Sequence, residues 1–322
     1  MRRHVSKPTS LLIALLTITG LLLSACGPAA TPVPPAQAPE PTQAPTKPPE
    51  PTKEPTKPPT PAPPTATPAP KTLLDIIKAR GVMKVSTDPN YKPQSFLNDK
   101  GELDGFDIDV AKEVAKRLGV KVEFVTPDWD IIVAGNWGGR WDLSIGSMTI
   151  TPDRKNVLFF SSPYYYTPAQ FAVHKNSTIT KIEDFSGKTV CVGSGTTYES
   201  YLGGQLTLEG ETILKQVTGA KAQVLSTDSE CIQAIQAGRK EIAGVLTAQP
   251  TIEDAIKNGA PIKKLGDPVY YEDLAAAMDK NVPNSQAFVD AVTKAIDEMR
   301  TDGTLTNLSV KWYGVDISTK KQ

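Results

Sequence analysis

Residues 71–322 alternate short apolar runs with longer segments in which apolar residues recur every three or four positions. Apolar residues that alternate with polar ones predict strands, and a period near 3.6 predicts helices. We therefore predict strands at residues 82–86, 120–124, 143–146, 188–193 and 241–246. Helices are predicted at residues 72–80, 107–118, 229–237 and 285–300, with two more that begin near 197 and 305. Strands that alternate with helices indicate an α/β fold with mostly parallel strand pairing.

Several predicted helices carry residues that favour helix ends. Gly81 and Gly119 follow the first two helices, where a left-handed residue commonly ends the hydrogen-bond pattern. Asp107 stands at the start of the second helix, where its carboxylate can cap free backbone N–H groups. Because ligands of open α/β sheets bind beyond the carboxyl ends of the strands, the loops after residues 86, 145 and 192 are the candidate site.

The first 25 residues have the pattern of a secretory signal peptide. Three basic residues within the first seven precede an apolar run at residues 11–23, which is short for a membrane span, and small residues come before Cys26. A cysteine in this place resembles the signal of bacterial lipoproteins. That resemblance implies loss of residues 1–25, a lipid anchor on Cys26 and an extracytoplasmic location on the outer face of the cell membrane. An ordinary signal peptide with a chance cysteine is the alternative.

Residues 26–70 are rich in proline, threonine and alanine and contain no aromatic residue. Such a segment buries too little apolar surface to offset the entropy lost on ordering, and its prolines favour an extended conformation. We therefore expect a disordered tether that lifts a folded domain away from the membrane. A linker whose length has no role is the alternative. Residues 71–322 are long enough for one large domain or two medium ones.

The chain carries 35 basic and 35 acidic residues, and no segment concentrates the basic ones. A nucleic acid is therefore not an expected partner. The sequence has no Cys-x-x-Cys pair, and His174 is the one histidine after the signal peptide. We therefore expect neither a metal site nor a cofactor.

Cys191 and Cys231 are the cysteines that remain once Cys26 carries lipid. In an oxidising compartment such a pair favours a disulfide. The bond would close a loop of about 41 residues and stabilise the fold by roughly 4 kcal/mol. Two buried free thiols are the alternative.

Two of the three candidate loops contain groups that can bind a carboxylate. Arg154 presents a rigid fork of donors that matches a carboxylate. Ser147 and Thr149 alternate along a backbone predicted to be extended, so we expect their hydroxyls to point the same way. The glycine-rich turn at residues 193–197 places backbone N–H groups before a helix, which favours an anion. A surface ion pair for Arg154 and a plain turn for the glycines are the alternatives.

Several motifs follow one another between residues 71 and 315. They are Asp88-Pro-Asn-Tyr, Gly101-Glu-Leu-Asp-Gly-Phe-Asp-Ile-Asp-Val-Ala, Ser147-Met-Thr-Ile-Thr-Pro-Asp-Arg, Ser162-Pro-Tyr-Tyr, Ser194-Gly-Thr-Thr-Tyr, and Asp302-Gly-Thr with Lys311-Trp-Tyr-Gly. Together these motifs resemble bacterial extracellular solute-binding proteins of the polar amino-acid type, family 3.

The resemblance implies a two-lobe periplasmic-binding-protein fold, type II or Venus-flytrap, whose lobes are joined by two hinge strands. One lobe would comprise residues 71–167 and 274–322, and the other residues 168–273. The ligand would be an amino acid or a related small carboxylate, enclosed between the lobes by hinge closure. The protein, expected to be a monomer, would deliver the ligand to the membrane permease of an ABC importer.

The motif match also implies a set of ligand-binding residues: Asp88, Tyr91, Trp129, Ser147, Thr149, Arg154, Gly195, Thr196, Thr197 and Thr247. Arg154 would bind the ligand carboxylate, assisted by the hydroxyls of its own loop. Thr197 and the backbone before it would close on the ligand from the second lobe. Tyr91 and Trp129 would cover the ligand, or pack within a lobe as the alternative, and Asp88 would face its distal end.

Thr247, give or take one residue, replaces an aspartate that the family usually places after a strand of the second lobe. That aspartate pairs with the α-ammonium of the ligand, and a buried ammonium with no anionic partner is costly. Either Asp88 or another acid compensates, or the ligand is not a plain α-amino acid. A methylated ammonium held by cation–π attraction to Tyr91 and Trp129 is one such ligand.

A cleft enzyme of the same fold, of the dehydratase or lyase type, is the first alternative function. Catalysis requires a general acid or base in the cleft, and no Ser-His-Asp or Cys-His order is visible, so we expect no enzyme. A sensor-type ligand-binding module is the second alternative. We disfavour it because it usually needs a transmembrane helix that leads to a cytoplasmic module, and residues 71–322 contain no apolar run long enough for such a helix.

Overall fold

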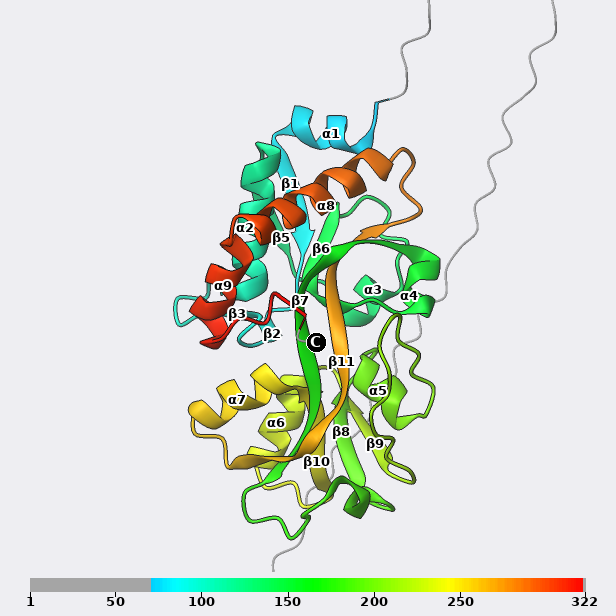
Figure 1. Cartoon of the computed structure of the whole chain (residues 1–322), viewed down its shortest axis with the longest axis vertical. Helices are drawn as coiled ribbons and strands as arrows, with labels where there is room; N and C mark the ends of the chain where they lie inside the picture. The colour runs from blue at the N-terminus through cyan, green and yellow to red at the C-terminus, as the bar shows by residue number, and fades with distance from the viewer. Residues whose placement is uncertain (1–70, 321–322) are drawn as a thin grey trace, which may run out of the picture. The chain divides into compact units, whose positions relative to one another are not determined.

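The computed structural model of the protein describes residues 71–320 (Figure 1). The expected signal peptide, the lipidation site Cys26 and the tether at residues 26–70 lie outside the described residues. Within residues 71–320, no helix combines the length and the apolar character that a membrane crossing requires.

A mixed sheet of eight strands runs through the structure in the order β5-β1-β6-β11-β7-β10-β8-β9. Its two longest strands, β7 (Leu158–His174) and β11 (Ile262–Asp279), pair antiparallel and extend from one half of the structure into the other (Figure 1). We call the half that contains β1, β5 and β6 lobe 1, and the half that contains β8, β9 and β10 lobe 2. The predicted two-lobe α/β fold with two connecting strands is thus confirmed.

Lobe 1 is built on three neighbouring strands that pair parallel to one another. These are β1 (Val82–Ser86), β5 (Lys121–Val125) and β6 (Leu143–Thr149). Its helices are α1 (Leu73–Arg80), α2 (Phe106–Leu118), α3 (Trp129–Val133), α4 (Pro152–Val157), α8 (Gln286–Thr301) and α9 (Thr304–Tyr313). A small antiparallel sheet adds β2 (Asn90–Tyr91), β3 (Ser95–Leu97) and β4 (Leu103–Asp104).

Lobe 2 repeats this arrangement on a smaller scale. Its parallel strands are β8 (Thr189–Gly193), β9 (Lys221–Leu225) and β10 (Ile242–Ala248). Its helices are α5 (Thr197–Leu202), α6 (Asp228–Gln236) and α7 (Gln249–Lys257), with a 3-10 turn at Ile182–Phe185. Each lobe therefore has its own sheet segment and its own apolar core.

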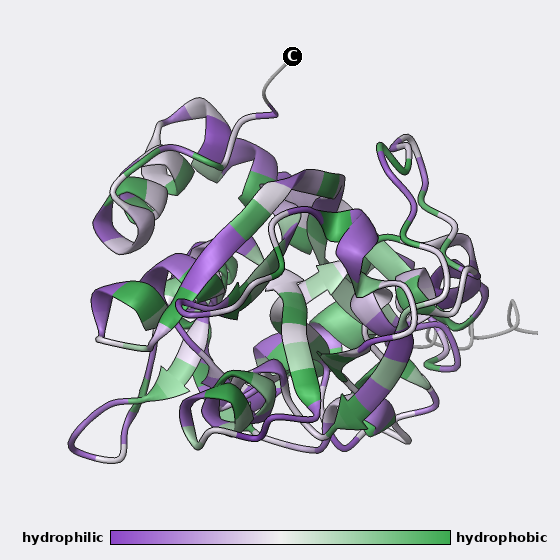
Figure 2. Cartoon of the chain, turned by 90° about the horizontal axis from the view of Figure 1, so that it is seen from below, coloured by the Kyte–Doolittle hydropathy of each residue, from purple (hydrophilic) through white to green (hydrophobic). Residues whose placement is uncertain are grey.

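The helices carry hydrophilic and hydrophobic residues in alternating stripes (Figure 2), as expected for helices that pack one face on a sheet. In α8 the buried face consists of Phe288, Val289, Val292, Ala295, Ile296 and Met299. Those side chains pack against the strands of lobe 1 together with apolar residues of α2. Hydrophobic burial of this kind fixes the strand ends, and hence the loops that follow them.

Gly81 and Gly119 end α1 and α2 in left-handed conformations, as the sequence predicts. The predicted capping role of Asp107 is wrong. Gly105 occupies the cap position of α2, where an added Cβ would collide with the Gln94 carbonyl, and Asp107 lies inside the helix, fully buried. Its carboxylate accepts hydrogen bonds from the hydroxyls of Ser147 and Tyr164, which draw it toward the strand end of β6 instead of its own helix terminus.

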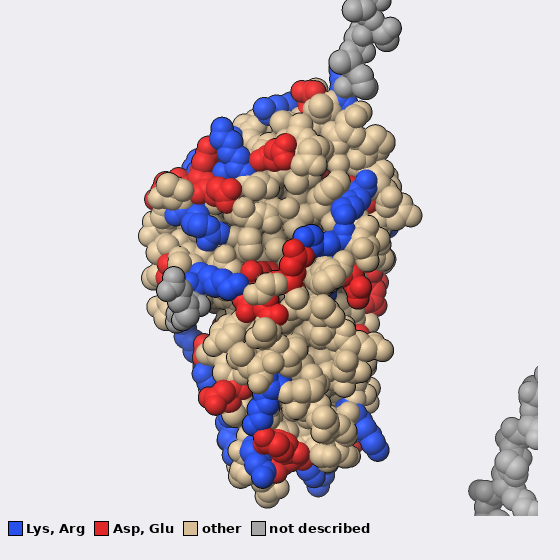
Figure 3. Space-filling model, turned by 45° about the vertical axis from the view of Figure 1, so that its right-hand side comes forward, with Lys and Arg blue, Asp and Glu red and all other residues tan. Residues whose placement is uncertain are grey.

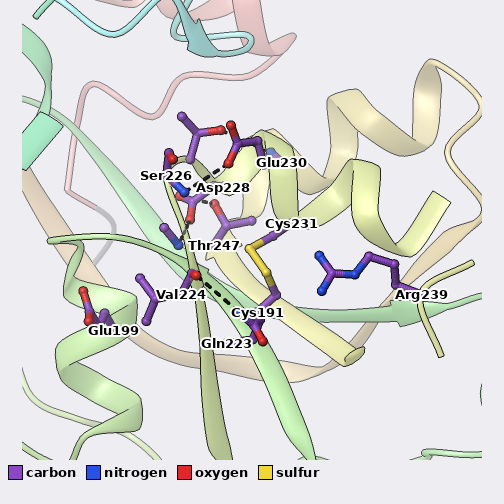
Figure 4. The surroundings of a disulfide bond; sticks show 12 residues. Cys191, Glu199, Gln223, Val224, Ser226, Asp228, Glu230, Cys231, Arg239 and Thr247 are labelled. Atoms are coloured by element: carbon purple, nitrogen blue, oxygen red, sulfur yellow. Dashed lines mark hydrogen bonds between the residues drawn. A yellow bond between two sulfur atoms is a disulfide. The ribbon is translucent and has the colours of Figure 1, made fainter. Parts of the chain in front are cut away.

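A disulfide joins Cys191 of β8 to Cys231 of α6, with Cα atoms 5.4 Å apart (Figure 4). Both residues are fully buried, in a cluster that includes Ile232, Ile235 and Val245. The expected disulfide is therefore present in the fold, and the alternative of two free thiols is not.

Replacement of both cysteines by alanine should lower the free energy of unfolding by about 3–4 kcal/mol, since the bond closes a long loop in the unfolded chain. Urea denaturation of the full chain measures the change. Ala234→Gly, a small truncation in the same cluster of helix α6, is a matched control that keeps the disulfide, and we expect it to cost about 1 kcal/mol. An unfolding midpoint unchanged by the double replacement would contradict the expected stabilisation.

Candidate ligand-binding site

A pocket lies between the lobes, beyond the carboxyl ends of β1, β6 and β8. Most of the predicted ligand-binding residues line it: Asp88, Tyr91, Trp129, Ser147, Thr149, Arg154, Thr196 and Thr197. Gly195 and Thr247 are not among its lining residues, although each forms a hydrogen bond with a residue that is. The acids Asp228 and Glu272 also line the pocket, and the sequence did not single them out.

Arg154 reaches the pocket from the first turn of α4. Thr151 caps this helix by accepting a hydrogen bond from the Arg154 backbone N–H, which fixes where the side chain begins. The guanidinium donates from Nη1 to the carbonyl oxygen of Thr149 at 3.1 Å, and from Nη2 to that of Gly195 at 3.0 Å. It also lies over the indole ring of Trp129, 5.6 Å from the ring centre.

The charge of Arg154 has no carboxylate within salt-bridge distance in the described part of the chain. Desolvation lowers the pKa of Arg154, and the negative charge of Glu272 opposes that shift. A guanidinium offers five N–H donors, and backbone carbonyls take only two here. The remaining donors and the uncancelled charge suit an anionic group in the pocket.

Ser147 does not continue an extended backbone into Thr149, so the expectation that their hydroxyls share one direction is wrong. Its φ of 58° is left-handed, which turns the chain between the two residues. The Ser147 hydroxyl donates to Asp107 at 2.7 Å and accepts from Tyr165, whereas the Thr149 hydroxyl donates to Glu272 at 2.7 Å. Each hydroxyl therefore serves a different buried acid.

Glu272 is an acid in the middle of β11, only 2% exposed. Its carboxylate accepts hydrogen bonds from Thr149 of lobe 1 at 2.7 Å, and from Thr197 and Tyr198 of lobe 2 at 2.5 and 2.7 Å. The carboxylate thus joins both lobes to a connecting strand. The available signal in the sequence was an acidic pair, Glu272 and Asp273, inside a segment that is otherwise apolar and aromatic.

Asp228 is an acid of lobe 2 that lies beside Thr247, the residue that replaces the family's usual aspartate. It is the first residue of α6, 5% exposed, and it accepts hydrogen bonds from the Gly193 N–H at 2.8 Å and from the Thr247 hydroxyl at 2.9 Å (Figure 4). Thr247 is fully buried behind it. The acid was missed because Thr227-Asp-Ser-Glu has the pattern of a helix start, and Thr227 does cap α6.

Backbone N–H groups of the glycine-rich turn donate hydrogen bonds to carboxylates of the protein itself. The Gly193 N–H donates to Asp228, and the Gly195 N–H donates to the Glu199 carboxylate at 2.8 Å. The turn is therefore a poorer anion site than its sequence suggests. Gly195 serves closure instead, because its carbonyl oxygen accepts hydrogen bonds from Arg154 and from the Trp129 indole across the cleft. Its φ of 66° would strain any residue with a Cβ, and an added Cβ would lie 2.6 Å from the Asp130 Oδ1 atom, which would have to move.

Further hydrogen bonds hold the lobes together around the pocket. The hydroxyls of Tyr91 and Tyr198 lie 3.2 Å apart, and the Ser194 hydroxyl donates to Asp130 at 3.1 Å. Tyr91 and Trp129 thus contact lobe 2 directly, rather than packing only within lobe 1. The pocket has a volume of about 40 Å³, far below the several hundred Å³ of a typical small-molecule pocket.

Two acids of the pocket, Asp228 and Asp88, have raised pKa values because they are buried. The pKa of Asp228 is raised to about 7, chiefly by desolvation and also by the charges of Asp88 and Glu272, against hydrogen bonds from Gly193 and Thr247 that lower it. Desolvation also raises the pKa of Asp88 and brings that of Asp107 to about 7. A cation placed among these carboxylates would stabilise their charged forms. The site can therefore take a molecule with a carboxylate for Arg154 and an ammonium for the acids.

Comparison with known proteins gives relatives over most of the described residues. L-cystine-binding protein TcyJ of Escherichia coli (strain K12) is 32% identical over 253 residues, which cover 78% of this chain and 89% of that protein. A solved ancestral arginine-binding protein bound to arginine has a TM-score of 0.64 and 33% identity, covering 73% of this chain and 99% of its own. The ancestral amino acid-binding protein AncCDT-1, a precursor of cyclohexadienyl dehydratase, has a TM-score of 0.65 and 32% identity, covering 74% and 99%.

The sequence profile of the bacterial extracellular solute-binding proteins, family 3, matches residues 83–315. That range includes lobe 2, most of lobe 1 and every residue that lines the pocket. The protein therefore belongs to the bacterial extracellular solute-binding proteins of family 3.

Proposed function

We propose that the protein captures an α-amino acid between its lobes and presents it to the permease of an ABC importer. The observation that carries this proposal is the separation of charge in the pocket. The guanidinium of Arg154 has no acid partner among the described residues, and Asp228 and Asp88 have no basic partner there. A zwitterion with a carboxylate at one end and an ammonium at the other completes both sets of interactions.

Capture by hinge closure accounts for the size of the pocket. With about 40 Å³ enclosed, an amino acid enters only after the lobes separate. Opening would break the Arg154 and Trp129 bonds to Gly195, and those that Thr197 and Tyr198 make with Glu272. A ligand bound to Arg154 and to the lobe 2 acid would favour the closed population again, and the permease would recognise that closed form.

The same proposal includes the segments outside the described residues. Lipid on Cys26 and a tether at residues 26–70 would hold a monomeric domain at the outer face of the membrane. The sequence pattern supports this anchor. Membrane fractionation tests it, since Cys26→Ser should move the protein from the membrane to the soluble fraction, and an unchanged distribution would oppose it.

We also propose that the ligand leaves the cleft chemically unchanged. The question arises because AncCDT-1 is described as the precursor of a dehydratase, and because an acid whose pKa is near 7, as that of Asp228 is, suits general acid–base catalysis. Burial beside other acids is sufficient to explain that pKa. Mass spectrometry of amino acids incubated with the protein should return them intact, whereas an eliminated or deaminated product would support an enzyme.

Arg154→Ala should weaken amino-acid binding by about 2–5 kcal/mol, the range for removal of one partner from a buried charge pair. Thermal shifts over a panel of amino acids, betaines and small carboxylates first identify ligands, because a bound ligand raises the melting temperature. Calorimetry with the best of them then compares the variant with Arg239→Ala, an exposed arginine of lobe 2 that pairs with Glu241. Equal affinity in the Arg154 variant and the control would contradict the proposed role.

Asp228→Asn should raise the stability of the ligand-free protein at pH 8 while weakening ligand binding. The folded-state pKa of Asp228, about 7, exceeds the ordinary value, so its contribution to stability falls as pH rises from about 4 to about 7. Asparagine can keep both hydrogen bonds without the charge, and the gain at pH 8 is at most about 4 kcal/mol.

Denaturant unfolding at pH 5 and pH 8 measures this effect. The stability difference between wild type and Asp228→Asn should be larger at pH 8 than at pH 5. Glu230→Gln, an exposed acid of the same helix turn, is the control and should show a smaller dependence on pH. A stability difference that is the same at both pH values would contradict the assignment.

A further inference from the structure

The pocket contains more acidic side chains than a neutral amino acid can pair with. Asp88, Asp228 and Glu272 line it, and Arg154 is the one basic side chain among its lining residues. A neutral α-amino acid brings one carboxylate for the arginine and one ammonium for an acid. Two of the three acids would then remain without a cation in the closed cleft.

None of these three acids has a lysine or arginine nitrogen within 4.0 Å anywhere in residues 71–320. Asp107, fully buried behind Ser147, is also without a basic partner there. A buried carboxylate is costly unless it is paired and hydrogen-bonded. The pocket therefore retains hydrogen-bonded acids that still lack a positive partner.

Glu272 is the clearest case of a hydrogen-bonded pocket acid without a basic partner. Three hydroxyls, from Thr149, Thr197 and Tyr198, donate to its two oxygens. The hydroxyls hold it at the pocket wall from both lobes, and no lysine or arginine nitrogen of the described residues lies within 4.0 Å of it.

The excess of acid is local. The whole chain carries equal numbers of basic and acidic residues, and the face in Figure 3 shows both kinds interspersed. Outside the pocket, Lys155 pairs with Glu209 at 2.7 Å across the lobes, and Lys92 lies 3.9 Å from Asp254. These acids therefore have basic partners, whereas the acids of the pocket have none within 4.0 Å in the part of the chain that the structure describes.

Aromatic side chains complete the wall. Tyr91, Trp129 and Tyr198 line the pocket beside these acids. Aromatic faces attract cations, and the attraction is larger where water is excluded. They also provide an apolar surface for the methylene groups of a long side chain.

We propose that the ligands are cationic α-amino acids, which carry one carboxylate, one α-ammonium and a second cationic group at the end of an aliphatic side chain. This inference rests on the amino-acid capture proposed above. Arg154 takes the carboxylate, and the three acids share the two cationic groups. Acidic amino acids and cystine are disfavoured, because a second ligand carboxylate would meet no second basic side chain among the lining residues.

Calorimetry of the full chain with matched ligand pairs tests the inference. L-lysine is compared with L-norleucine, which lacks the terminal ammonium, and L-arginine with L-citrulline, which has a neutral urea group. We expect the cationic member of each pair to bind at least about tenfold more tightly, equivalent to about 1.4 kcal/mol. Equal or tighter binding of norleucine, citrulline, L-glutamate or L-cystine would overturn the inference.

The outcomes also separate this inference from the proposed function. Binding of neutral amino acids alone would overturn cationic selectivity and leave amino-acid capture intact. No binding of any of these amino acids would overturn both. Each comparison uses the wild-type protein, so it does not depend on a variant that folds.

Glu272→Gln then assigns the selectivity to a residue. The affinity ratio of lysine to norleucine should fall about tenfold or more in this variant, while norleucine affinity changes less. Glu241→Gln, an exposed acid of lobe 2, is the matched control and should keep the wild-type ratio. Asp88→Asn provides a second variant if Glu272→Gln does not fold. A wild-type ratio in every folded variant would overturn the role of the pocket acids.

Discussion

The uncancelled charge of Arg154 is the feature on which the rest of the site depends. Backbone carbonyls of Thr149 and Gly195 orient its guanidinium, and the Trp129 ring covers it, without the neutralisation that a carboxylate would bring. One of those carbonyls belongs to each lobe. The same side chain is therefore a recognition group for an anion and a contact that forms when the cleft closes.

The buried acids at and behind the pocket make the ligand-free fold less stable than it would be without their charges. Asp228 and Asp107 are buried beside other negative groups, which raises the pKa of each to about 7. The disulfide offsets part of this cost in the place where it arises. Cys191 lies in β8 close to Gly193, Cys231 lies in α6 close to Asp228, and the bond thus fixes the two elements that hold the lobe 2 acid (Figure 4).

Much of the architecture follows from local patterns, because apolar periodicity and glycine caps act within a few residues. From the predicted ends of β1, β6 and β8 it follows that Asp88, Thr149 and Thr197 lie at one cleft, and all three do line one pocket. Contacts between distant segments could not be derived this way. The left-handed Ser147, the inward turn of Asp107 and the position of Glu272 on a connecting strand all depend on partners far along the chain. The role of Asp228 in the pocket could not be predicted, because an acid at the start of a helix is usually interpreted as a helix cap.

A crystal structure of the protein with a bound amino acid tests the central claim most directly. Our account predicts ligand carboxylate oxygens about 3 Å from the Arg154 guanidinium nitrogens, with the α-ammonium facing the acids of the pocket. A ligand carboxylate bound elsewhere, with Arg154 paired to Glu272 or turned to solvent, would contradict it.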